Sequence, residues 1–234
     1  MKILNEIQTI NKIYKGVSIG RYGDGELINI IENSYKIEKM QDFSLELKNK
    51  LVSIIHNPKK DFLICLPYFN KDNMLRLKNK SLFNRTSRLI ETQYLNNILY
   101  KEVGSPMITR PDNTIDLLCE EYFNRFKNIF KDKKVLIINF NEILLDHPIF
   151  SMSKENSFLK IPKRNCFNSY REILNTCKDY IQKNYDLIAV SAGPTSTCLS
   201  YDLCNQIQTI DIGQICRIYN QFYNLEFKNL VSQL

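Results

Sequence analysis

Short apolar runs alternate with longer amphipathic segments along almost the whole of this chain, and no other feature limits its fold as strongly. A short apolar run between turn signals is typical of a buried β-strand. Strands that alternate with helices form parallel sheets covered by helices on both faces. The runs that predict strands are Val17–Arg21, Phe62–Leu66, Met107–Thr109, Lys134–Asn139, Phe158–Ile161, Leu187–Ala192 and Thr209–Ile212.

Apolar residues at helical spacing predict helices between these strands. Ser169 and Glu172 stand three residues apart at the start of one of them, which is the spacing of a capping box. A further amphipathic helix is expected within residues 1–15, packed on the rest of the domain. The four clearest helical ranges are Phe43–His56, Ile115–Phe130, Tyr170–Ile181 and Thr195–Asn205.

Length and composition fit one globular domain. The chain has 234 residues, of which 44% are hydrophobic, and this is enough for a sizeable core. No repeat, low-complexity segment or Gly/Ser/Pro-rich linker divides it. We therefore expect residues 1–234 to form a single α/β domain of the Rossmann-like type, with a mostly parallel sheet flanked by helices. No run approaches the ~20 apolar residues of a membrane span, and Asn5 and Glu6 interrupt any signal-peptide core.

The cysteine pattern and the net charge limit which cellular compartment and which kinds of binding partner are expected. The seven cysteines are odd in number and none form a C-x-x-C pair, so neither a disulfide framework nor a zinc site is expected. A reducing cytoplasm fits this usage. The net charge of +7 comes from scattered lysines, and no basic stripe with aromatic platforms predicts nucleic-acid binding. A polyanionic or membrane-surface acceptor is compatible with the charge.

The turn after the first predicted strand combines a cation with two carboxylates. Residues 18–26 read SIGRYGDGE, so Arg21, Asp24 and Glu26 share one strand-to-helix turn. Carboxylate oxygens suit Mg²⁺ or Mn²⁺, which leave other positions to phosphate and water. An ordinary helix start is the alternative: Asp24 as N-cap, Glu26 in the first turn, and the neighbouring glycines as turn residues.

Two further turns are expected to meet this one, because ligands of open α/β sheets bind beyond the carboxyl ends of the strands. Gly193 would let a ligand approach the backbone, Pro194 suits a first helical position, and Thr195 offers a hydroxyl beside free N–H groups. Taken in isolation, these residues fit an ordinary helix start better. Asp211 ends another strand and either contacts ribose hydroxyls or caps the following turn. Arg110 is either a second phosphate clamp or an exposed structural arginine.

The turn SIGRYGDGE resembles the signature of the GT-D-type glycosyltransferases, a group first catalogued as a domain of unknown function. Downstream segments are similar to the same family in the same order, and the similarity runs from Gly16 to Tyr223. These segments are the strand and turn 189–195, the Tyr-Asp-Leu helix 199–203, the strand and turn 209–213 and, more weakly, PKRNCF at 162–167.

This resemblance implies a metal-dependent glycosyltransferase with a GT-D-like fold. Its cofactor would be Mn²⁺ or Mg²⁺, its donor a nucleotide-diphosphate sugar such as a UDP-sugar, and its acceptor a glycan, glycolipid or glycoprotein. Asp24 and Glu26 would be the catalytic and metal-binding residues. The donor-binding residues would be Arg21, Gly23, Gly193, Pro194, Thr195 and Asp211.

The chain departs from the family pattern in two segments. The family continues after Asp-Ile-Gly with a histidine and several acids, whereas residues 214–223 contain neither, and the loop after Asn139 also differs. The acceptor site, any catalytic base and the sugar specificity therefore stay open. Glu142, Asp146 and His147 are replacement candidates for the base, although a surface turn explains Asp146 and His147 as well. The alternative functions are a nucleotide-sugar-binding protein without turnover and a metal-dependent phosphohydrolase.

Overall fold

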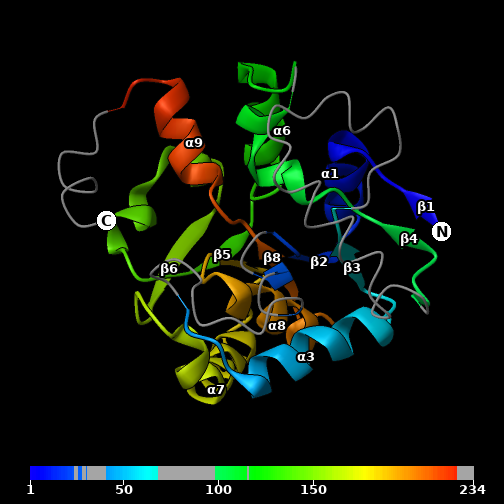
Figure 1. Ribbon diagram of the computed structural model, residues 1–234. Helices are drawn as coiled ribbons and strands as arrows, with labels where there is room; N and C mark the ends of the chain where they lie inside the picture. Colours follow the sequence, from blue (N-terminus) through cyan, green and yellow to red (C-terminus); the bar gives the residue numbers. More distant parts are fainter. Residues whose placement is uncertain (24–25, 28–29, 31–40, 68–97, 115, 226–234) are drawn as a thin grey trace.

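A parallel six-stranded sheet forms the centre of the molecule (Figure 1). The computed structural model describes residues 1–23, 26–27, 30, 41–67, 98–114 and 116–225. Within these residues the strand order is β3-β2-β8-β7-β5-β6, and every neighbouring pair is parallel. The strands are β2 (Ser18–Arg21), β3 (Phe62–Cys65), β5 (Lys134–Asn139), β6 (Glu155–Lys160), β7 (Leu187–Val190) and β8 (Gln208–Asp211).

Helices cover both faces of this sheet, as Figure 1 shows. One face carries α1 (Glu6–Tyr14), α6 (Glu120–Asn128) and α9 (Ile215–Phe222), whose apolar residues share one core cluster. The other face carries α3 (Leu45–His56), α7 (Tyr170–Gln182) and α8 (Pro194–Leu203), which form two further clusters. This three-layer α/β architecture confirms the predicted fold class.

Shorter elements connect the layers. A separate parallel pair joins β1 (Lys2–Ile3) to β4 (Glu102–Val103). Several turns of 3-10 helix follow strands or precede helices. They are η1 (Pro106–Thr109), η2 (Pro111–Asn113), η3 (Glu142–Asp146), η4 (Pro148–Phe150) and η5 (Cys166–Ser169).

Close packing of α8 on β2 depends on one glycine. A Cβ added to Gly20 would lie 2.8 Å from the Phe62 ring and 2.9 Å from the Thr197 methyl group. Thr197 Oγ1 also donates a hydrogen bond of 2.8 Å to the carbonyl of Arg21. The carboxyl end of β2 is therefore held directly against α8, the helix that follows β7.

One predicted strand is wrong, because Met107–Thr109 lies in the 3-10 helix η1. Pro106 has no N–H to donate to a strand neighbour, and the Ser105 hydroxyl accepts the N–H of Met107 at 3.1 Å. These two features favour a helical turn over an extended strand.

Two predicted helix starts and one predicted capping box also change. The helix expected from residue 115 begins only at Glu120, because Asp116 has a φ of 69° that no α-helix contains. The N-terminal helix begins at Glu6, where Asn5 and Gln8 form a capping box. The capping box predicted at Ser169 is wrong, since its side chain makes no cap hydrogen bond. Helix α9 was not predicted.

Candidate active site

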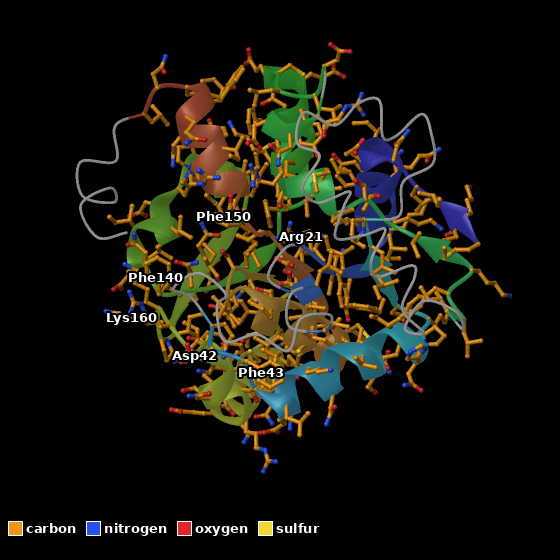
Figure 2. All side chains as sticks on the ribbon, viewed as in Figure 1. Arg21, Asp42, Phe43, Phe140, Phe150 and Lys160 are labelled. Carbon is orange, nitrogen blue, oxygen red and sulfur yellow. The ribbon has the colours of Figure 1, made fainter. Side chains whose placement is uncertain are left out.

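A buried ion pair joins the carboxyl ends of β2 and β8, which are neighbours in the sheet. Arg21 Nη2 lies 3.1 Å from Asp211 Oδ1, and the two side chains are only 15% and 3% exposed. The same carboxylate oxygen accepts the N–H of Gly213 at 3.0 Å. Figure 2 shows Arg21 near the centre of the molecule, at the sheet. The ion pair fixes both side chains at the edge where ligands of such sheets bind.

Gly213 leaves room for the Arg21 guanidinium. Its φ is +43°, and a Cβ at this position would lie 1.9 Å from Arg21 Nη2 and 2.7 Å from Thr109 Oγ1. Any other residue would both strain the backbone and displace the arginine. Sequence reasoning did not place Gly213 in the site. The signal was its position two residues after Asp211, the residue whose side chain accepts its N–H.

The 3-10 helix η1 binds the second terminal nitrogen of the Arg21 guanidinium, because the carbonyl of Pro106 accepts a hydrogen bond of 3.1 Å from Nη1. The turn before η1 is anchored to α1: Ser105 Oγ donates to the buried carboxylate of Glu6 at 3.0 Å, and Ser105 N–H donates to Thr9 Oγ1 at 3.0 Å. None of these three α1 and η1 contacts was predicted. They connect the N-terminal helix to the position of Arg21.

Glu26 adds a second carboxylate to this corner. It is 8% exposed, and its Oε2 accepts the N–H of Gly23 at 2.8 Å. Burial and the negative charge of Asp211 raise the pKa of Glu26 to about 7, whereas Arg21 and the hydrogen bond from Gly23 act in the opposite direction. Burial also raises the pKa of Asp211, against the lowering effect of Arg21. Carboxyl groups with strongly shifted pKa values, such as that of Glu26, cluster at functional sites.

The turn between β7 and α8 lies at the same edge of the sheet. Val190 pairs with Asp211 in the parallel register, and Ser191 Oγ donates to the carbonyl of Gly213 at 2.9 Å. Gly193 has a φ of +57° and a ψ of −141°, and no atom lies within 4 Å of where its Cβ would be. Pro194 is the first residue of α8, as expected. Thr195 is fully buried, with its hydroxyl beside the Cys166 thiol.

Five of the eight proposed site residues therefore gather at one edge: Arg21, Gly23, Glu26, Gly193 and Asp211. Pro194 and Thr195 continue from Gly193 into α8, where Thr195 lies within the core. Asp24, the remaining proposed ligand, lies outside the described residues. Across the described ranges, no group of three or more His, Cys, Asp or Glu side chains is placed to hold a metal ion.

His147 belongs to the core and not to a surface turn. It is 3% exposed and packs against the rings of Phe150 and Tyr219. Its Nδ1 accepts the N–H of Ile149 at 3.1 Å, and the ring also interacts with Asn220 and the Cys216 backbone. Burial lowers the pKa of His147 to about 4. Glu142 and Asp146, by contrast, are exposed on η3.

In a three-layer α/β domain of this kind, the carboxyl edge of the parallel sheet is where ligands bind. The family model of the glycosyltransferase GT-D fold matches residues 19–232. The chain belongs to this GT-D family, and the fold and family support a glycosyltransferase role.

Solved structures agree with this assignment. A structure of the highly conserved domain of unknown function 1792, described as having a distinct glycosyltransferase fold, is 29% identical with a TM-score of 0.82, covering 96% of this chain and 82% of that one. A structure described as a new glycosyltransferase of the same domain type from Streptococcus sanguinis is 25% identical with a TM-score of 0.80, covering 96% and 85%. No curated protein matches the chain.

Proposed function

We propose that this chain is a metal-dependent glycosyltransferase that moves a sugar from a nucleotide-diphosphate sugar, a UDP-sugar, to a glycan, glycolipid or glycoprotein acceptor. The observation that carries the proposal is the convergence of Arg21, Glu26 and Asp211 beside the β7–α8 turn, within a glycosyltransferase fold. In this reaction the bond from the anomeric carbon to the diphosphate breaks and a bond to an acceptor hydroxyl oxygen forms. Negative charge develops on the leaving diphosphate and has to be neutralised.

The proposed ligands of a hard divalent cation are carboxylates. Glu26 and Asp211 offer two that lie near each other, and Asp24 is proposed as a further ligand from the sequence. Mg²⁺ and Mn²⁺ bind through one or two carboxylates together with phosphate oxygens. When bound, such an ion would neutralise charge on the leaving diphosphate.

The chain's own residues supply orientation. Arg21 fixes the direction of the Asp211 carboxylate and opposes the rise of its pKa, because its guanidinium is held by both that carboxylate and the Pro106 carbonyl. The open space at Gly193 allows phosphate oxygens to reach the N-terminus of α8, where backbone N–H groups favour anions. Gly23 directs Glu26 through its N–H.

The proposal extends to location and partners. We place the protein in the cytoplasm, because its described cysteines are free and all but one are buried. In the part of the chain that the structure describes, none of the helices has the length and apolar character of a membrane span. The partners would be the nucleotide-sugar donor and a glycan-bearing acceptor, which can lie at a membrane surface, and not nucleic acid.

Calorimetry of UDP binding with Mn²⁺ and with EDTA tests the proposal. Wild-type protein should bind UDP more tightly with Mn²⁺, and Glu26→Gln should abolish that difference. Gly193→Val should weaken UDP binding by steric block, and Thr195→Ser, its control, should change it much less. Equal affinity in Mn²⁺ and EDTA would contradict the metal role.

Product analysis separates the three classes of function. With a panel of UDP-sugars and acceptors, a transferase forms a new glycoside, a phosphohydrolase releases products with water alone, and a binding protein shows saturation without turnover. Release of sugar phosphate without any acceptor dependence would contradict the transferase assignment.

A further inference from the structure

Arg110 and Arg217 lie on two elements, far apart in sequence, that come together at a corner beside Gly213. Arg110 is the C-cap of η1, and Arg217 lies in the first turn of α9, whose N-cap Gln214 follows Gly213. The end of η1 touches Gly213, since a Cβ there would lie 2.7 Å from Thr109 Oγ1. The residue after Thr109 and the first turn after Gly213 therefore share this corner.

The corner holds more positive than negative charge. Asp112 binds Nε and Nη2 of Arg110 at 2.9 Å each, which leaves Nη1 outside this pair. Arg217 is exposed, and its Nη2 donates to the neutral Gln214 side chain. Partial burial and the charge of Arg110 lower the pKa of Arg217, whereas Asp112 opposes this. Arg217 is thus within electrostatic range of Arg110 and of the Asp112 carboxylate that binds it.

We propose that Arg110 and Arg217 form an anion subsite that holds a phosphate group of the acceptor. Guanidinium groups present paired N–H donors that match phosphate oxygens, and a phosphate between them would remove their mutual repulsion. The phosphate subsite stands on the geometry of these two arginines, and its assignment to the acceptor rests on the proposed function.

The position of the corner favours the acceptor over the donor. The proposed donor elements lie at Glu26 and at the N-terminus of α8, and α8 packs on the face of the sheet that carries α3 and α7. Arg217 belongs to α9, which packs with α6 on the opposite face (Figure 1). Gly213 and the Arg21–Asp211 pair lie between the donor elements and Arg217. Two ligands could therefore approach the same sheet edge from opposite faces.

Binding of glycerol 1-phosphate, measured by calorimetry at constant ionic strength without divalent ions, tests the subsite. Arg217→Gln and Arg110→Gln should each weaken binding about tenfold, the loss expected for one charged hydrogen-bonding partner. Arg171→Gln, which removes an equal charge from an exposed position on α7, is the control and should leave the affinity unchanged. Unchanged affinity in both subsite variants would overturn the proposal.

Binding of UDP with Mn²⁺ to the same variants tests the assignment to the acceptor. Arg217→Gln should keep the wild-type affinity for UDP while its affinity for glycerol 1-phosphate falls about tenfold. If the UDP affinity falls as much as the glycerol 1-phosphate affinity, the acceptor assignment is wrong. The two arginines would then belong to the donor-binding site. If wild-type protein does not bind UDP at all, the proposed function fails, whereas the glycerol phosphate measurement still decides whether the subsite exists.

Discussion

Arg21 and Asp211 stand 190 positions apart in the chain and form a buried ion pair across neighbouring strands, with 3.1 Å between Nη2 and Oδ1. In chain order, the pair joins the first strand of the central sheet, β2, to its last strand, β8. Each partner has a further contact, Arg21 to the Pro106 carbonyl and Asp211 to the Gly213 N–H. The geometry of the candidate site therefore depends on this contact.

Removing the negative partner should destabilise the fold strongly. In Asp211→Asn the charge of Arg21 remains buried without its carboxylate, and losing one partner of such a pair costs about 3 kcal/mol or more. Urea unfolding measures this loss. Glu121→Gln breaks the exposed pair with Arg125 and should leave stability nearly unchanged. A loss in Asp211→Asn no larger than in this control would mean that the ion pair does not stabilise the fold.

A methyl group at Gly213 should displace Arg21. Gly213→Ala adds a Cβ that would clash with the guanidinium at 1.9 Å, in addition to the backbone strain of a positive φ. Gly16→Ala is a matched control, because Gly16 also has a positive φ but its Cβ would meet no atom within 4 Å. We expect about 1–2 kcal/mol of destabilisation from strain in the control and clearly more in Gly213→Ala. Equal losses in thermal or urea unfolding would show that Arg21 moves away freely.

Glu26 should make the metal-free protein less stable as the pH rises towards neutrality. Its folded-state pKa of about 7 lies above the ordinary 4.5, so the unfolded chain releases this proton at lower pH than the folded chain. Stability therefore falls between about pH 4.5 and 7, by up to about 1.4 kcal/mol per pH unit.

The Glu26→Gln variant isolates the contribution of Glu26 to this pH dependence of stability. Unfolding curves with EDTA across this pH range should show a smaller fall in stability for the variant than for the wild type. Parallel curves for the two proteins would mean that Glu26 is already ionised in the folded state well below pH 7.

His147 should have the opposite effect on the acid side. Its folded-state pKa of about 4 lies below the ordinary 6.5, so its contribution to stability is complete above pH 6.5 and is lost as the pH falls towards 4. His147→Gln should reduce stability at pH 7 and should also flatten the acid loss. A variant that keeps the full wild-type acid loss would show that other groups cause it. Because the ring is buried, we also expect no activity loss beyond that caused by reduced stability.

Local patterns in the sequence were enough to predict the fold class and most of the central strands. Lys134–Asn139 agrees residue for residue with β5, and the other confirmed strands shift by one to three residues at one or both ends. Fully buried parallel strands are continuous apolar runs bounded by turns, so their signal is local. The Gly-Arg-Tyr-Gly turn and the Gly-Pro-Thr turn were also predictable, because strand ends in a parallel sheet meet at one edge.

The contacts among the site residues, by contrast, could not be predicted from the sequence, because they form only when distant segments fold together. No local pattern shows that Asp211 pairs with Arg21 or that Gly213 must lack a side chain beside it. Met107–Thr109 is apolar enough for a strand, yet Pro106 and the Ser105 cap make it helical, and its neighbour Pro106 then holds Arg21. His147 reads as a loop residue but is buried by α9, which comes much later in the chain. These outcomes depend on contacts between distant segments, whose partners and burial are set only when the sheet and its two helical layers are assembled.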